Sequence, residues 1–123
     1  MINKTYFFDT YAFIEIYNKN PNYFKFTNCC PIITKLNLYE VYYTLLRLGN
    51  KEVANNFLKE FYDFAIDYDK NIITKAAEFK FHLKKRDISM ADSIGYFVAL
   101  EKGIKFLTGD KQFEGMYNVE FVK

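Results

Sequence analysis

The sequence has few of the side chains that form disulfides and thiolate or imidazole metal sites, with two cysteines and one histidine. Cys29 and Cys30 are adjacent, and neighbouring residues rarely have the backbone geometry for a disulfide bond between them. A metal site would need a C-x-x-C spacing and further ligands, which are missing. We therefore expect both cysteines to be small buried side chains at the start of a strand, and His82 to lie on a helix face.

Long apolar runs are missing as well. The longest contain four or five residues, whereas a helix that spans a bilayer needs about 20. The N-terminal stretch MINKTYFF leads directly into structure, without a signal-peptide core or cleavage site. These absences predict a cytoplasmic protein with no membrane segment.

The sequence also has little excess of charge of either sign. Its formal net charge is +2, which excludes the broad positive field of a nucleic-acid coat protein. Apolar residues make up 50% of the chain and charged residues 26%, the balance of an ordinary globular protein. Because 123 residues suffice for one core and no linker interrupts them, we expect a single domain over residues 1–123.

Several enzyme motifs are absent. Neither G-x-G-x-x-G nor G-x-x-x-x-G-K-[ST] occurs, which excludes the dinucleotide-binding fold and the P-loop. No Ser-His-Asp set is evident in a chain with one histidine. A phosphatase of the haloacid dehalogenase type would resemble D-x-D-x-T after the first strand, but Asp9 is followed by Thr10 and Tyr11. The sequence therefore offers no evident protein nucleophile.

What the sequence does contain is an alternation of strands and helices. Five short runs have the composition of β-strands, at residues 4–8, 29–33, 64–68, 104–108 and 119–123. Helical patterns occupy residues 10–20, 37–49, 51–64, 70–87 and 89–103. Gly49 and Gly103 are plausible C-terminal stops of two of these helices. Because parallel strands need a crossover, this order predicts an α/β fold with a mostly parallel sheet of four to five strands.

Four acidic residues fall at one edge of this predicted sheet. Asp9 and Asp110 each follow the end of a strand, whereas Glu40 and Asp92 lie in the first turn of helices that begin at the same edge. In open α/β sheets, ligands bind beyond the carboxyl ends of the strands. We therefore expect these four carboxylates to converge on one rim.

Each of these acids has a simpler explanation when it is taken alone. Asn37 and Glu40, like Ser89 and Asp92, have the spacing of a helix capping box. The two strand-end aspartates could themselves be N-caps. Together, however, the four carboxylates would repel one another and raise one another's pKa values unless a cation shared the site.

The chemistry of the four side chains favours one kind of cation. Carboxylate oxygens with no histidine or cysteine nearby select Mg²⁺ or Mn²⁺ over zinc. Such an ion can polarise a phosphoryl oxygen and supply the hydroxide that attacks a phosphodiester. Candidate RNA-binding cations beside the rim are Lys35, Arg86 and Lys111, although each of them could be an ordinary solubilising residue.

Three stretches resemble the PIN domain family, and within it the small VapC-like toxins. They are YFFDTYAFIEI (6–16), NLYEVYYTLLRLG (37–49) and ISMADSIGYFVALEKGIKFLTGDKQFE (88–114). The last is the most specific, because an acid-led helix, a glycine, an apolar strand and Thr-x-Asp follow one another there. One position departs from the family pattern, since members often have a small hydroxyl residue where this chain has Tyr11.

The resemblance implies a fold, a site and an activity. The fold is a three-layer α/β/α sandwich, and the activity is that of a metal-dependent endoribonuclease. Asp9 and Asp92 would be the principal Mg²⁺ ligands, Glu40 and Asp110 would complete the site, and Thr108 would help to position it. A PIN-type RNA-processing nuclease outside any toxin-antitoxin pair and an inactive α/β binding module remain alternatives.

Two helical stretches carry more apolar side chains than one core-facing stripe requires. They are VYYTLLRL (41–48) and FLKEFYDF (57–64), and exposed apolar patches usually mark interfaces. Both could instead be fully buried. With the resemblance to VapC-like toxins, they favour a homodimer that binds a small antitoxin protein in a hydrophobic groove.

Overall fold

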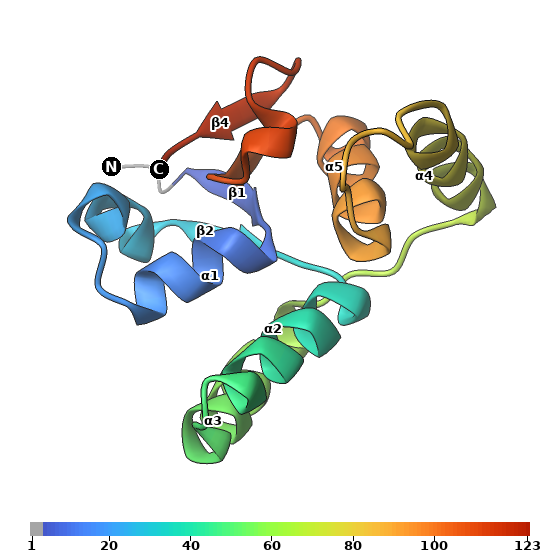
Figure 1. Cartoon of the computed structure of the whole chain (residues 1–123). Coiled ribbons are helices and arrows are strands. Elements are labelled where there is room, and N and C mark those ends of the chain that lie inside the picture. Colours follow the sequence, from blue (N-terminus) through green and yellow to red (C-terminus); the bar gives the residue numbers. More distant parts are fainter. Residues whose placement is uncertain (1–3) are drawn as a thin grey trace.

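A four-stranded sheet runs through the centre of residues 4–123, the part of the chain that the computed structural model describes (Figure 1). Its order is β2-β1-β3-β4, and every neighbouring pair is parallel. The strands are β1 (Thr5–Phe8), β2 (Cys30–Ile32), β3 (Lys105–Thr108) and β4 (Val119–Phe121). The predicted α/β fold is thus confirmed. The expectation that no signal peptide is present concerns residues that lie partly outside this range.

Helices join the strands and cover both faces of the sheet (Figure 1). The α-helices are α1 (Thr10–Tyr17), α2 (Lys35–Arg47), α3 (Lys51–Phe61), α4 (Lys70–His82) and α5 (Met90–Lys102). Three 3₁₀ helices add to them: η1 (Pro21–Asn28), η2 (Tyr62–Phe64) and η3 (Lys111–Phe113). Gly103 ends α5 with a φ of 68°, a left-handed conformation that glycine adopts at little cost.

Alternation along the strands explains the three layers. Tyr6 and Phe8 of β1 pack into a core with side chains of α1, α2 and α3, whereas Phe7 packs with side chains of α4 and α5. Successive residues of a strand point to opposite faces of the sheet, so the side chains of β1 contribute to the cores on both faces. Gly95 lets α5 lie directly on the sheet, because a Cβ atom there would stand 2.5 Å from the Phe7 ring.

The strand order reverses between β1 and β3. The chain leaves β1 through α1 and η1 to reach β2 on one side, and it returns through α5 to β3 on the other side. The backbone amide of Asp9 donates to the carbonyl of Leu107 across this junction at 3.3 Å. Ligands of doubly wound sheets bind in the crevice at this kind of switch point.

Some local predictions were wrong. Residues 64–68 do not form a strand, and only Ala65 makes a bridge, to Ile33. The chain turns into α2 directly after Ile33, so β2 offers little length against which a fifth strand could pair. Cys30 is exposed and Cys29 is only partly buried, because β2 is an edge strand.

Helix boundaries also differ from the sequence pattern. α2 begins at Lys35 because Thr34 is its N-cap and accepts from the amide of Asn37 at 3.3 Å. Glu40 therefore lies in the second turn of α2 and not in the first, and Asn37 is not a cap. α4 ends at His82, which leaves Arg86 in the loop before α5.

Candidate active site

Two aspartates follow the central strands at the switch point. Asp9 comes directly after β1 and caps α1, because its Oδ1 accepts from the amide of Ala12 at 2.8 Å. Asp110 follows β3 and caps η3 through the amide of Gln112 at 3.0 Å. The capping interpretation of both residues is therefore confirmed. It accounts for only one carboxylate oxygen of each residue, and the carboxylates stay at the carboxyl edge of the sheet.

Two further acids reach the same place from helices. Asp92 lies in the first turn of α5, where its backbone amide donates to the cap hydroxyl of Ser89 at 3.0 Å. Glu40 of α2 accepts from the hydroxyl of Thr10 at 2.7 Å. This hydrogen bond joins the second turn of α2 to the start of α1, so the carboxylate of Glu40 is held on the same side as the two strand-end aspartates.

An acid-lined pocket of about 360 Å³ opens where these elements meet. Its lining residues are Thr10, Tyr11, Ile14, Glu15, Glu40, Asp87, Ser89, Asp92 and Asp110. Asp9 lies close enough for its charge to raise the pKa of Asp92. The structure thus brings all four predicted acids together.

Burial and mutual repulsion perturb the two most deeply placed carboxyl groups. Burial, together with the charges of Asp110 and Glu40, raises the pKa of Asp9 to about 7, against the lowering effects of Thr108 and of the amide of Ala12. Burial likewise raises the pKa of Asp92, with further contributions from Asp9, Glu40 and Asp110. Without a cation, the folded protein therefore resists full ionisation of this cluster.

Two of these carboxylates keep an oxygen for which the protein provides no partner. Asp9 Oδ2 and Asp92 Oδ1 are buried and accept no hydrogen bond, and such oxygens are costly unless something binds them. Hard oxygen donors of this kind suit Mg²⁺ or Mn²⁺. As the side chains stand, no three His, Cys, Asp or Glu residues within positions 4–123 form a group that could hold one ion. The carboxylate oxygens suit a divalent cation, but the carboxylate groups would have to move closer together to bind it.

Thr108 and Tyr11 fix the loop that carries Asp110. The buried hydroxyl of Thr108 accepts from the backbone amide of Asp110 at 3.0 Å, and its closeness to Asp9 lowers the pKa of that carboxyl. The ring of Tyr11 lies over Gly109, where a Cβ atom would meet it at 2.1 Å. The same Cβ atom would stand 2.3 Å from the backbone carbonyl of Val122, so both the Tyr11 ring and the neighbouring backbone require glycine within LTGD.

Comparison with protein-family models decides the family, because the PIN domain model matches residues 6–119. The chain belongs to the PIN domain family. PIN domains are generally nucleases. A chain of a solved toxin-antitoxin complex from Klebsiella pneumoniae has a similar fold, with a TM-score of 0.69 and 16% sequence identity over 94% of this chain and 95% of that one. No curated protein sequence matches.

The three predicted cations have different positions around this PIN-domain pocket. Arg86 lies in the loop before α5 and donates from Nη1 to the carbonyl of Gln112 at 2.7 Å, which ties that loop to η3 beside Asp110. Lys111 is exposed next to Asp110. Lys35 instead lies over the ring of Tyr62, 5.5 Å from its centroid, and lines a different hollow between α2 and α3.

Sequence reasoning missed several residues of the pocket. Thr10 orients Glu40 through a contact between residues 30 apart in the chain, and no local pattern reports such a contact. Glu15 and Asp87 add two more carboxylates to the lining. Glu15 lies four residues after Tyr11 on α1, the spacing of side chains on one helix face, so a helical projection from Tyr11 could have pointed to it.

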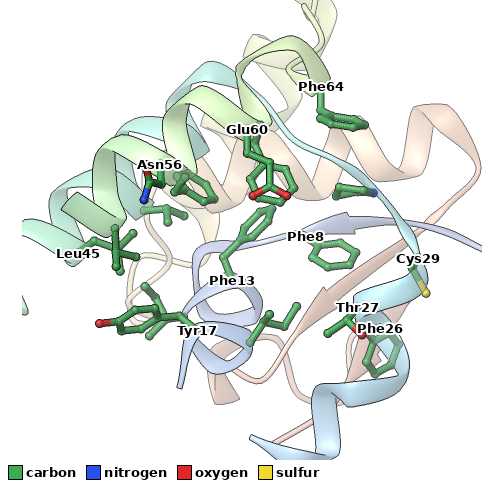
Figure 2. A pocket seen from close by; sticks show the side chains of 17 residues that line it. Phe8, Phe13, Tyr17, Phe26, Thr27, Cys29, Leu45, Asn56, Glu60 and Phe64 are labelled. Carbon is green, nitrogen blue, oxygen red and sulfur yellow. The ribbon is translucent and has the colours of Figure 1, made fainter. Parts of the chain in front are cut away.

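A larger hollow lies next to the acid pocket and shares the side chain of Ile14 with it. It has a volume of about 570 Å³ and is lined mostly by apolar side chains of α1, α3 and η1, which Figure 2 shows converging around Phe8 and Phe13. Asn56 and Glu60 of α3 supply polar atoms to its lining.

Within residues 4–123 no helix is both long and apolar enough to cross a membrane.

Proposed function

We propose that this PIN domain is a Mg²⁺-dependent endoribonuclease that hydrolyses RNA phosphodiester bonds, with Mn²⁺ able to substitute. The observation that carries the proposal is the pair of buried oxygens without partners, Asp9 Oδ2 and Asp92 Oδ1, in a cluster of carboxylates at the sheet's switch point. Membership of a family that generally consists of nucleases supports the reaction class. Residues 1–123 would then form one nuclease domain that acts in the cytoplasm.

Each acid has a distinct role in this proposal. Asp9 and Asp92 hold the cation, which when bound polarises the phosphoryl oxygen and activates water. The hydroxyl of Thr10 donates to Oε1 of Glu40 and so holds this carboxylate toward the cluster. Asp110 completes the cluster, because the amide of Gln112 fixes its Oδ1 and the hydroxyl of Thr108 fixes its backbone. The protein thereby holds its ligands in place before the substrate arrives.

Metal dependence is the first test of this function. We expect the purified protein to cleave a single-stranded RNA of mixed sequence in Mg²⁺ or Mn²⁺. Cleavage should stop when EDTA is added, because the chelator removes the cation whose positive charge binds the phosphate. Gel analysis of the RNA fragments measures the rate. Cleavage that continues in EDTA at the same rate would refute the proposal, and restoration by added Mg²⁺ excludes damage by the chelator.

We further propose that the nuclease is the toxin of a type II toxin-antitoxin pair, and that it forms a homodimer. Two observations support an antitoxin partner: the similar fold of a chain from a toxin-antitoxin complex, and an apolar hollow large enough for several side chains (Figure 2). Phe64 lies at this hollow and is 41% exposed, so a partner that covers it would bury apolar area.

The antitoxin proposal predicts a neighbouring short reading frame whose product co-purifies with this chain. Phe64→Asp is expected to abolish the complex, because it would place a charge in an apolar contact. Tyr117→Asp serves as the control, since Tyr117 is 80% exposed and does not line the hollow. A complex that survives Phe64→Asp unchanged would contradict docking at this hollow.

Two alternatives give different outcomes in the same experiments. A PIN-type RNA-processing nuclease outside any toxin-antitoxin system would cleave RNA in Mg²⁺ but would have no antitoxin partner. An inactive α/β binding module would cleave nothing, and changes to the acids would alter only stability. The partnerless oxygens favour the nuclease, because helix capping alone explains one oxygen of Asp9 and leaves the other buried and unbound.

A further inference from the structure

A row of four side chains runs along the outer face of α2 and takes no part in the acid pocket. Lys35, Tyr39, Tyr43 and Arg47 are four residues apart, and residues at this spacing are neighbours on a helix surface. The rings of Tyr39 and Tyr43 are parallel within 1°, with centroids 6.4 Å apart. Tyr39 is 71% exposed and Tyr43 53% exposed, and both line one wall of the open hollow between α2 and α3, so the two aligned rings are accessible from solvent.

Cations stand at both ends of this tyrosine row. The guanidinium of Arg47 lies 5.9 Å from the centroid of the Tyr43 ring. The ammonium of Lys35 lies 5.5 Å from the ring centroid of Tyr62, which closes the hollow between α2 and α3. Because Lys35 and Arg47 are the first and last residues of α2, they are about 18 Å apart along its axis. The order is therefore cation, ring, ring, cation.

The tyrosine row lies beside the acid pocket. Tyr43 comes three residues after Glu40 on the same helix, and this spacing makes the two side chains surface neighbours. Glu40 in turn lines the pocket with Asp92 and Asp110. A polymer held at the pocket could therefore continue onto the row without leaving α2.

The charges on this row favour an anionic occupant over a second copy of the chain. In a two-fold contact centred on the row, antiparallel helices would place Lys35 against Arg47 of the other copy, and parallel helices would place each cation against its equivalent. Both arrangements oppose like charges, which is costly at an interface. A phosphate chain would be attracted to both cations.

We propose that Lys35, Tyr39, Tyr43 and Arg47 form a platform for single-stranded RNA, on which bases stack against the two tyrosines while the cations bind phosphates. Aromatic rings accept any base on their π-faces, and cations beside them follow the backbone. The platform rests on the proposed ribonuclease function and deepens it by naming the substrate class, since a duplex does not expose its base faces.

The test measures binding apart from cleavage. A fluorescein-labelled oligouridine of ten nucleotides is titrated with the full chain in EDTA, and fluorescence anisotropy gives the affinity. Tyr39→Ala/Tyr43→Ala is expected to weaken binding at least about 10-fold, because two stacking surfaces are lost. Tyr39→Phe/Tyr43→Phe keeps the rings and should bind like the unmodified protein, as should the control Tyr117→Ala. An abasic oligomer of the same length should bind the alanine pair and the unmodified protein equally.

Three results for the Tyr39→Ala/Tyr43→Ala variant would overturn the platform. The variant could bind oligouridine as tightly as the unmodified protein, or it could lose as much affinity for the abasic oligomer as for oligouridine. It could also sediment as a monomer where the unmodified protein is a dimer, with its RNA affinity unchanged. Cleavage assays separate this proposal from the proposed function. Tyrosine-dependent binding without cleavage in Mg²⁺ would refute the ribonuclease alone, whereas cleavage with an unaltered KM in the alanine pair would refute the platform alone.

Discussion

Asp92→Asn is expected to reduce RNA cleavage in Mg²⁺ by more than about 100-fold while the protein stays folded. Partners that only support a metal ligand cost about 10- to 100-fold when removed, so loss of a ligand itself should cost more. The substitution keeps the size of the side chain and leaves the backbone amide that donates to Ser89 unchanged. Asp9→Asn should have the same effect, because asparagine still caps α1 but cannot supply a charged oxygen.

Glu101→Gln provides the matched control for these two variants. Glu101 is an exposed acid at the other end of α5 from Asp92, so the change removes one charge from the same helix without touching the pocket. Cleavage rates and circular dichroism spectra are to be measured for all three variants. Unchanged cleavage by both Asp9→Asn and Asp92→Asn would show that the acids at the switch point are not the catalytic group.

Asp9→Asn is also expected to make the metal-free protein more stable at neutral and alkaline pH. Burial raises the pKa of Asp9 in the folded protein to about 7, above its ordinary value of 3.8. The stability that depends on its proton is fully present below about pH 4 and is lost as the pH rises through about 7. Asparagine mimics the protonated group, so the advantage of the variant should grow by about 2 kcal/mol between about pH 5 and about pH 8.

Urea unfolding of the variant and the unmodified protein in EDTA, at about pH 5 and about pH 8, measures this advantage. Adding Mg²⁺ at the higher pH should stabilise the unmodified protein and narrow the gap, because a cation that binds only the folded state shifts unfolding by mass action. The Asp9→Asn variant should gain much less stability from the cation. An advantage that is the same at both pH values would mean that folding does not raise the pKa of Asp9. An advantage that Mg²⁺ does not reduce would mean that Asp9 does not bind the cation.

The positions of Asp9 and Asp110 could be predicted from the sequence because both follow strong strand signals. YFF and IKFLT are apolar and end in a charge, and parallel strands bring their carboxyl ends to one edge. Asp92 followed from the Ser89 cap and the helix that it begins. The positions of these three aspartates could therefore be predicted from local sequence patterns and from one rule about parallel sheets.

The rest of the site depends on contacts that local patterns do not contain. The register of α2 is set by Thr34, which bonds to Asn37, so the start of the helix and the turn that holds Glu40 were misplaced. The segment at 64–68 has the composition of a strand, but β2 ends before the two could pair along their length. Lys35 was expected at the rim, yet its side chain lies over Tyr62 because α3 packs beside α2.

Anomalous scattering from crystals of the protein grown in Mn²⁺ would test the proposed metal site most directly. We predict an anomalous peak in the acid pocket, within bonding distance of Asp9 Oδ2 and Asp92 Oδ1, the two buried oxygens that accept no hydrogen bond from the protein. Crystals of Asp92→Asn in the same solution should lack the peak or show it much weakened. An empty pocket in the unmodified protein at millimolar Mn²⁺, with these two oxygens bonded to protein groups instead, would contradict a metal site at the switch point.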